Sequence, residues 1–145
     1  LILLPRDKIG SFTALTIGAL IFLSTAFGDT IPNLRHIWLS REIVQVADSV
    51  APCMKKQIIS VGYHEPSLVF LAGTDTILAP DGAAAAKALK QNTCRVAVID
   101  GHDKKPFLAA FDGVTQKPQA AAKVGGLNSG HGAEALLTLY RMPPK

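Results

Sequence analysis

The sequence opens with a long uncharged segment and continues with shorter runs in which apolar and polar residues alternate. Residues 9–28 (IGSFTALTIGALIFLSTAFG) contain no charged side chain, and Lys8 and Asp29 flank them. An α-helix rises about 1.5 Å per residue, so this segment spans about 30 Å, the thickness of the hydrocarbon core of a bilayer. The pattern predicts a transmembrane helix at 9–28, a juxtamembrane flank at 1–8 and an extracytoplasmic domain at 29–145.

A cleaved secretory signal peptide is the alternative for the apolar segment. The small residues Ser-Thr-Ala at 24–26 resemble a cleavage site, although the apolar region of a signal peptide is usually about 7–15 residues long. Either alternative exports the rest of the chain. Arg6 and Lys8 favour a cytoplasmic N-terminal flank. Because the sequence begins at Leu1 rather than Met, we expect it to be the C-terminal part of a larger membrane protein.

An amphipathic helix is predicted directly after the apolar segment. Apolar residues recur at helical spacing from Pro32 to Val50, Pro32 suits an early helical turn, and Pro52 ends the pattern. Trp38 within it has two alternatives, a place at the level of the lipid headgroups or the commoner outcome of packing into the domain.

The remaining pattern predicts a small α/β domain. Short β-branched runs predict strands, and the segments between and after them predict helices capped at Asp81 and Asp103. The strands are expected at 57–61, 74–78 and 94–99, and the helices at 65–71, 82–90 and 103–111. This order implies a βαβαβ core with right-handed crossovers. Strand-like runs at 120–127 and 133–142, separated by a turn at 128–132, add a C-terminal hairpin to a mixed sheet.

Charge and cysteine content narrow the class of partner. The formal net charge is +4 and the basic residues are scattered, which gives no support to nucleic-acid binding. Cys53 and Cys94 are the two cysteines. In an exported domain they form a disulfide, whose loop closure contributes about 3–4 kcal/mol, or they remain two buried thiols; the sequence leaves both alternatives open.

The candidate site residues are Tyr63, His64 and Glu65, at the carboxyl end of the first predicted strand, where open α/β sheets build ligand sites. His64 and Glu65 suit acid–base chemistry and Tyr63 suits stacking on a sugar, whereas a turn leading into a helix explains the same residues more simply. The segment Asp100-Gly-His-Asp103 suits a cation, but a loop with a helix cap is again simpler. The four histidines lack metal-ligand spacing, so no metal site is predicted.

One stretch resembles a known family. Residues 60–74 (SVGYHEPSLVFLAGT) are similar to a segment near the C-terminus of glycosyltransferase family 39, the GT-C membrane enzymes that include protein O-mannosyltransferases and the 4-amino-4-deoxy-L-arabinose lipid A transferases. The order of features also agrees: a last span, a helix with Trp38 and Ser40, and a terminal Leu-Tyr-Arg strand at 139–141. The family's aromatic turn before that strand departs here to Gly-Leu-Asn-Ser-Gly-His at 126–131.

The resemblance implies a polytopic enzyme of the bacterial inner membrane that moves a sugar from a polyprenyl-phosphate carrier to a cell-envelope acceptor. The family's catalytic carboxylates lie near the N-terminus of the whole protein, so no catalytic residue and no cofactor is assigned to this chain. The expected partners are the bilayer, the other transmembrane segments of the same protein and the lipid-linked sugar. The expected role is a periplasmic cap over the active-site mouth, with Tyr63, His64 and Glu65 on the loop nearest to it.

Two other functions remain as alternatives. One is a membrane-tethered periplasmic domain that binds a protein or glycan without catalysis. The other is a periplasmic enzyme released after Ala26. Many further apolar spans encoded upstream, with an Asp/Glu pair after the first, would favour the transferase; a start codon just before Leu1 would favour the tethered domain.

Overall fold

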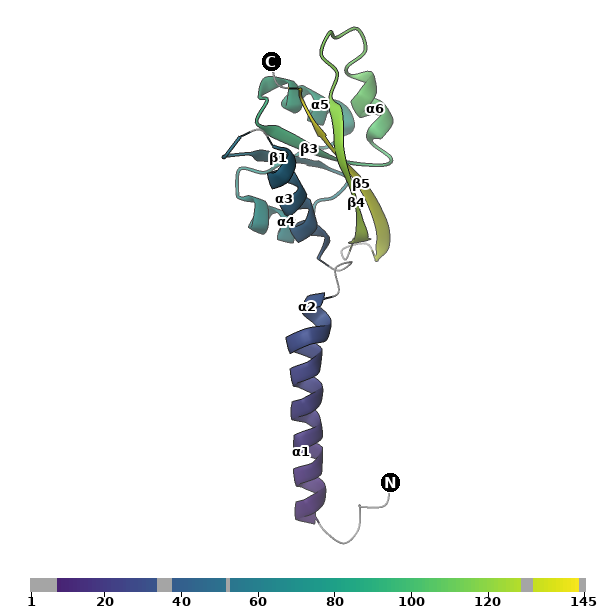
Figure 1. The fold of residues 1–145 in the computed structure, drawn as a ribbon. Coiled ribbons are helices and arrows are strands. Elements are labelled where there is room, and N and C mark those ends of the chain that lie inside the picture. The colour runs from purple at the N-terminus through teal and green to yellow at the C-terminus, as the bar shows by residue number, and fades with distance from the viewer. Residues whose placement is uncertain (1–7, 34–37, 52, 129–131, 144–145) are drawn as a thin grey trace. The chain divides into compact units, whose positions relative to one another are not determined.

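The computed structural model describes residues 8–33, 38–51, 53–128 and 132–143. Contacts divide the chain into two compact units, residues 1–35 and residues 36–145. The first unit holds an apolar helix and the second holds a mixed α/β domain (Figure 1). The structure thus confirms the predicted α/β class and the predicted apolar helix near the N-terminus.

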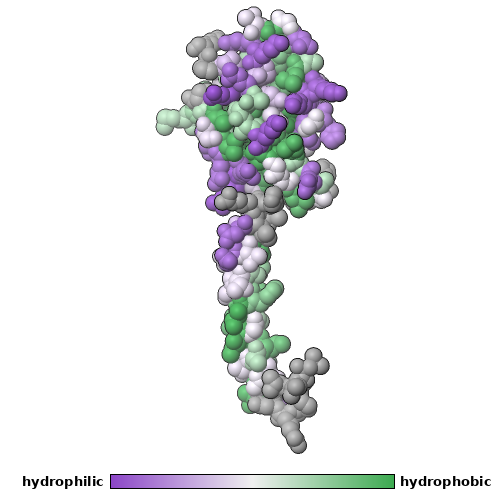
Figure 2. Space-filling view, turned by 45° about the vertical axis from the view of Figure 1, so that its right-hand side comes forward, coloured by the Kyte–Doolittle hydropathy of each residue, from purple (hydrophilic) through white to green (hydrophobic). Residues whose placement is uncertain are grey.

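The described part of the N-terminal unit is a continuous helix with three parts. Helix α1 covers Lys8–Thr25, the π-helical turn η1 covers Ala26–Thr30, and α2 covers Ile31–Asn33. Within the 26 residues Lys8–Asn33, a stretch of 18 residues has a mean hydropathy of 1.7 and none of it is buried, so the helix is long and apolar enough to cross a bilayer. Figure 2 shows its largely apolar surface. A cleaved leader shares these properties, so both predicted alternatives stay open.

Polar side chains in this helix bond to its own backbone. Thr13, Thr16 and Thr25 each donate a hydrogen bond of 2.9 Å to the carbonyl four residues earlier, which satisfies their hydroxyls without water. At the C-terminal end, the Asn33 amide donates to the backbone carbonyl and the carboxylate of Asp29, both at 2.9 Å. The helix is therefore apolar along most of its length and polar at its end.

The prediction that Pro32 begins the amphipathic helix is wrong. Pro32 lies in α2 at the end of the first helix, whereas the amphipathic helix α3 begins only at Leu39. The first helix continues past the apolar run to at least Asn33, because each further residue of a growing helix adds one hydrogen bond. The π-helical turn Ala26–Thr30 comes just before Pro32, whose missing N–H cannot join the regular ladder. Residues 34–37, together with Pro52, lie outside the described residues.

The α/β domain is built on a five-stranded mixed sheet with the order β2-β1-β3-β5-β4. Strand β1 pairs in parallel with β2 and β3, and β5 pairs antiparallel with β3 and β4. The strands are β1 Gln57–Val61, β2 Ile77–Leu78, β3 Arg95–Asp100, β4 Gln119–Asn128 and β5 Ala133–Arg141. The helices are α3 Leu39–Val50, α4 Pro66–Ala72, α5 Gly82–Gln91 and α6 Lys104–Ala109.

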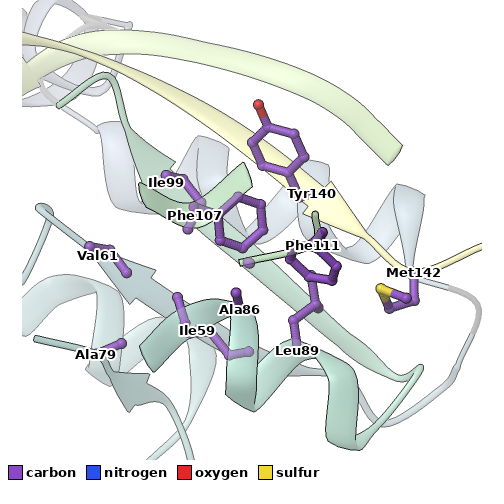
Figure 3. Packing of buried hydrophobic residues seen from close by; sticks show 12 residues of the cluster. Ile59, Val61, Ala79, Ala86, Leu89, Ile99, Phe107, Phe111, Tyr140 and Met142 are labelled. Carbon is purple, nitrogen blue, oxygen red and sulfur yellow. The ribbon is translucent and has the colours of Figure 1, made fainter. Parts of the chain in front are cut away.

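Apolar side chains form a separate cluster on each face of the sheet, because successive residues of a strand point to opposite faces. Ile59 and Ile99 belong to the cluster under α5 and α6, which includes Phe107, Phe111 and Tyr140 (Figure 3). The cluster on the other face lies under α3 and α4; its members include Leu39, Ile43, Ile58, Tyr63, Leu68, Val96, Val98, Leu137 and Leu139. The sheet is thus the middle of three layers.

Helix α3 runs from the edge where the parallel strands end to the edge where they begin. At its start, the hydroxyl of Ser40 lies 2.7 Å from the phenol oxygen of Tyr63, beyond the end of β1. At its end, Arg141 donates to the carbonyl of Val50 at 2.9 Å, and Arg141 pairs with Val96 near the start of β3. We call these the carboxyl edge and the amino edge of the sheet.

The boundaries of β1, α5, β3 and the hairpin agree with the sequence-based prediction to within one or two residues, and Asp81 caps α5 by accepting from the N–H of Ala84 at 2.7 Å. Strand β2 covers only Ile77–Leu78 and is shorter than predicted. The chain turns after Gly73, where the N–H of Thr76 donates a hydrogen bond to the carbonyl of Gly73. Asp103 was wrongly predicted to cap α6. Its backbone is already helical and its side chain makes no capping hydrogen bond.

Candidate functional site

Three segments far apart in the sequence meet at the carboxyl edge of the sheet. The predicted site loop, residues 62–65, follows β1, and α3 begins beside it through the contact between Ser40 and Tyr63. Asp100, the last residue of β3, pairs with Leu137 of β5, so the earlier residues of β5 extend past that edge. The carboxyl edge therefore holds the predicted site loop, the start of α3 and the end of the β4–β5 hairpin.

A cluster of hydroxyl groups fixes the site loop. The Ser40 hydroxyl lies 2.7 Å from the Tyr63 hydroxyl and 2.7 Å from the Ser67 hydroxyl. Ser60, buried in β1, donates a short hydrogen bond to the backbone carbonyl of Tyr63. These contacts tie the first turn of α3, the end of β1 and the first turn of α4 to one another.

Gly62 allows the chain to turn tightly after β1. Its φ is +78°, a conformation that costs other residues free energy. A Cβ atom at this position would lie 2.6 Å from the Cβ of Asp100, so the backbone after β1 packs directly on the end of β3. Glycine is therefore required here both for its backbone conformation and for its size.

Tyr63 is a structural member of the loop. Only 3% of its surface is exposed, and its ring belongs to the cluster under α3 and α4. Burial raises the pKa of the Tyr63 phenol above its ordinary value, an effect that the hydrogen bond to Ser40 partly offsets. In this arrangement the ring has no open face for a sugar, so the predicted stacking role would require the loop to open.

His64 is the exposed member of the loop, and Glu65 is half-buried. Glu65 occupies the N-cap position of α4 with extended backbone, Pro66 follows in the first turn, and the N–H of Leu68 donates to the Glu65 carbonyl. The carboxylate makes no capping hydrogen bond. The backbone thus provides the turn into the helix, which leaves the His64 imidazole as the group of this loop that most readily meets a ligand.

The second predicted loop, residues 100–103, lies beside the first. His102 is exposed, and its Nδ1 atom lies 3.8 Å from a carboxylate oxygen of Asp100. Among the described residues there is no group of three or more histidine, cysteine or acidic side chains arranged to hold a metal ion. His36 and His131 lie outside the described residues.

Cys53 and Cys94 lie at the opposite, amino edge. The structure joins them in a disulfide with a Cα–Cα distance of 5.5 Å. Next to it, the N–H of Gln57 donates to the carbonyl of Cys94 at 3.2 Å. The disulfide therefore links the segment before β1 to the segment before β3 and lies away from the site loop.

Sequence reasoning did not find the partners of Tyr63. Ser40 and Ser67 carry no local signal for this contact, because Ser40 lies on α3, 23 residues before Tyr63 in the loop after β1. The apolar end of the hairpin, with Leu127 and Leu136 exposed, was also missed, because its alternation reads as an ordinary strand with one buried face.

No protein-family model, curated protein or solved structure gives a significant match to this chain.

Proposed function

We propose that this chain is the C-terminal part of a membrane glycosyltransferase that transfers a sugar from a polyprenyl-phosphate carrier to a cell-envelope acceptor. In this proposal the apolar helix is the last transmembrane helix, and the α/β domain is an accessory cap on the periplasmic side of the inner membrane. The similarity of residues 60–74 to glycosyltransferase family 39 supports the class of enzyme.

One structural observation supports the cap more than any other. The site loop lies at the carboxyl edge of the sheet, and α3 begins at this same edge through Ser40 and Tyr63. The chain therefore enters the domain from the apolar helix at the edge that bears the site loop. A loop at this place is on the tethered end of the domain, where a carrier held in the membrane would present its sugar.

The segment that carries the family resemblance is also one structural unit. It runs from β1 through the site loop and α4, and it begins the β1–α4–β2–α5–β3 segment that we propose to be a βαβαβ core. Helix α4 buries Leu68 and exposes Phe70 and Leu71. We propose that these two exposed side chains contact the other transmembrane segments of the same protein.

The disulfide supports a location outside the cytoplasm. Cys53 and Cys94 are joined, and disulfides persist in oxidising compartments such as the periplasm. No catalytic residue is assigned within this chain. The proposed contribution of His64 and Glu65 is to line the mouth through which the lipid-linked sugar and the acceptor meet.

The test is sugar transfer by the product of the whole gene. We expect the double variant His64→Ala with Glu65→Ala to reduce transfer by about tenfold while the protein accumulates normally, because loop contacts that position a substrate affect the rate strongly. The double variant Lys87→Ala with Lys117→Ala, at exposed positions outside the loop, is the control. Unchanged transfer in the loop variant, with unchanged protein level, would refute the capping role.

A tethered binding domain without catalysis is the second candidate. The observation that favours it is that Tyr63 is buried and its hydroxyl contacts Ser40, so few reactive groups of the loop remain exposed. The two candidates differ in what precedes residue 1 in the gene. Many further apolar spans support the transferase, whereas a start codon immediately upstream supports the tethered domain.

A further inference from the structure

The outer end of the β4–β5 hairpin carries an apolar surface that the described part of the chain leaves uncovered. Along β5, Tyr140 and Thr138 are buried, but Leu136, on the same face, is 62% exposed. Leu136 pairs with Gly125 of β4, two residues from Leu127, which is 37% exposed. We call Leu127, Leu136 and the hollow between them the hairpin tip.

The register explains why this surface is uncovered. β3 ends at Asp100, which pairs with Leu137, so Leu136 lies beyond the last residue of the neighbouring strand. Tyr140 lies on the same face farther along, within the cluster that α5 and α6 cover. Figure 1 shows the hairpin extending past the other strands. The apolar face of the sheet therefore continues past the point where these helices cover it.

Glycine shapes the surface further. Gly125 and Gly126 have no side chains to fill the space opposite β5, and a Cβ at Gly125 would contact only Leu136 and Ala135, at 3.6 Å or more. The result is an open hollow of about 710 Å³ lined by Gly125, Gly126, Leu127, Glu134, Ala135 and Leu136. Leucines beside a hollow, with one carboxylate at its rim, suit acyl chains and lipid headgroups better than they suit an anionic ligand.

The short tether between the apolar helix and the domain makes a membrane the nearest apolar partner for the hairpin tip. Five peptide steps join Asn33 to Trp38, and an extended chain covers at most about 3.6 Å per residue, so the tether between the apolar helix and the domain can reach at most roughly 20 Å. Trp38 is 44% exposed, and tryptophan is enriched where membrane meets water. The hairpin tip lies at the same carboxyl edge as this entry point.

From these observations we propose that the hairpin tip docks on the lipid surface of the membrane that holds the apolar helix. The tether keeps the tip at a high effective concentration beside the bilayer, so a few apolar side chains suffice where a free domain would need more. Leu127 and Leu136 insert at the boundary between headgroups and acyl chains, and Glu134, which pairs with Leu127 in the hairpin, lies at the level of the headgroups. This docking fixes which edge of the domain faces the membrane.

The proposal goes beyond the proposed function, because it needs only the membrane anchor and no sugar transfer. The test uses the full chain in phosphatidylcholine vesicles with or without brominated acyl chains. An environment-sensitive dye is attached at Glu134→Cys in the hairpin tip, or at Lys117→Cys, an exposed position just before β4 at the amino edge, while the native disulfide is kept oxidised.

We expect bromine to reduce dye fluorescence roughly twofold at position 134 and to leave position 117 nearly unchanged, because an interfacial group sits about 5–10 Å into the headgroup region. Leu127→Ser with Leu136→Ser should abolish the quenching at 134 while circular dichroism shows an unchanged fold. Equal quenching at both positions would overturn the proposal, because the tether alone would then explain it. Absence of quenching, or contact of the tip with a second copy instead of lipid, would also overturn it.

Discussion

The hydroxyl oxygens of Ser40 and Tyr63 lie 2.7 Å apart and join the first turn of α3 to the loop after β1. Through this contact, the helix that receives the chain from the apolar segment is fixed to the loop that carries the candidate site. Ser40 also contacts Ser67 at 2.7 Å, so the first turn of α4 belongs to the same arrangement.

Removing the Tyr63 hydroxyl tests this contact. We expect Tyr63→Phe to lower the free energy of unfolding by about 1 kcal/mol, because Ser40 keeps its contact with Ser67. Tyr63→Ala removes the buried ring as well and should cost about 3–5 kcal/mol. Denaturant unfolding of the detergent-solubilised chain measures both values. Equal losses in the two variants would show that the ring contributes nothing beyond its hydroxyl.

Alkaline pH should destabilise the domain through its two tyrosines. Burial raises the pKa of both Tyr63 and Tyr140 above the ordinary value of 10.0. Their stabilising contribution is therefore complete below pH 10 and is lost as the pH rises through the raised values, because the unfolded chain releases the phenol protons first. Phenolate absorbance should appear together with unfolding. Phenol ionisation near pH 10 with the fold intact would contradict this expectation.

Gly62 and Gly101 provide a matched pair of substitutions. Gly62→Ala places a Cβ 2.6 Å from the Cβ of Asp100 at a φ of +78°, so we expect a loss of at least about 2 kcal/mol. Gly101→Ala meets no atom within 4 Å and should change stability by less than about 0.5 kcal/mol. Thermal or denaturant unfolding of the two variants is the measurement. A Gly62→Ala variant as stable as Gly101→Ala would show that the loop does not pack on β3 in this way.

The disulfide should contribute strongly to stability. Cys53 and Cys94 are 41 residues apart, and cross-linking a loop of this length stabilises a domain by about 3–4 kcal/mol in the chain-entropy model. We expect Cys53→Ser with Cys94→Ser to lose about that amount. In the unmodified chain, alkylation after reduction should label two cysteines, and alkylation of the unreduced chain should label none. Labelling before reduction would indicate two thiols.

Neighbouring residues of α4 separate a structural from a contact role. Leu68 is fully buried, whereas Phe70 is exposed. We expect Leu68→Ser to unfold or strongly destabilise the domain. Phe70→Ser should leave stability within about 0.5 kcal/mol but reduce sugar transfer by the whole gene product. Normal transfer by the Phe70→Ser protein would rule out the proposed contact between α4 and the rest of the proposed transferase.

Much of this fold could be predicted locally. β-Branched runs located β1 and β3, and Asp81 located the start of α5, because these signals lie within the element itself. The turn after Gly73 shortened β2, since the side chains at 74–76 suit a strand and a turn alike. For Asp103, a capping residue type was present but the backbone had already entered the helix.

The sequence correctly predicted that the loop with Tyr63, His64 and Glu65 follows β1 at the carboxyl edge of the sheet. It did not predict which residues contact this loop. The burial of Tyr63 depends on Ser40 and on the apolar side chains of α3, and no local pattern encodes which helix will cover a strand. The uncovered hairpin tip depends likewise on where β3 ends relative to β5, which is a property of register.

We propose that the apolar helix stays in the membrane and holds the α/β domain outside the cytoplasm, and the other proposals depend on this arrangement. The decisive experiment is protease treatment of bacterial spheroplasts that make the full-length gene product, followed by alkaline extraction of the membranes. We expect externally added protease to remove the domain from intact spheroplasts, and we expect the domain to stay with the extracted membranes when no protease is added. Protection of the domain in intact spheroplasts would show that the domain is not outside the cytoplasm, and its release into the alkaline supernatant would show that the helix is not a membrane anchor.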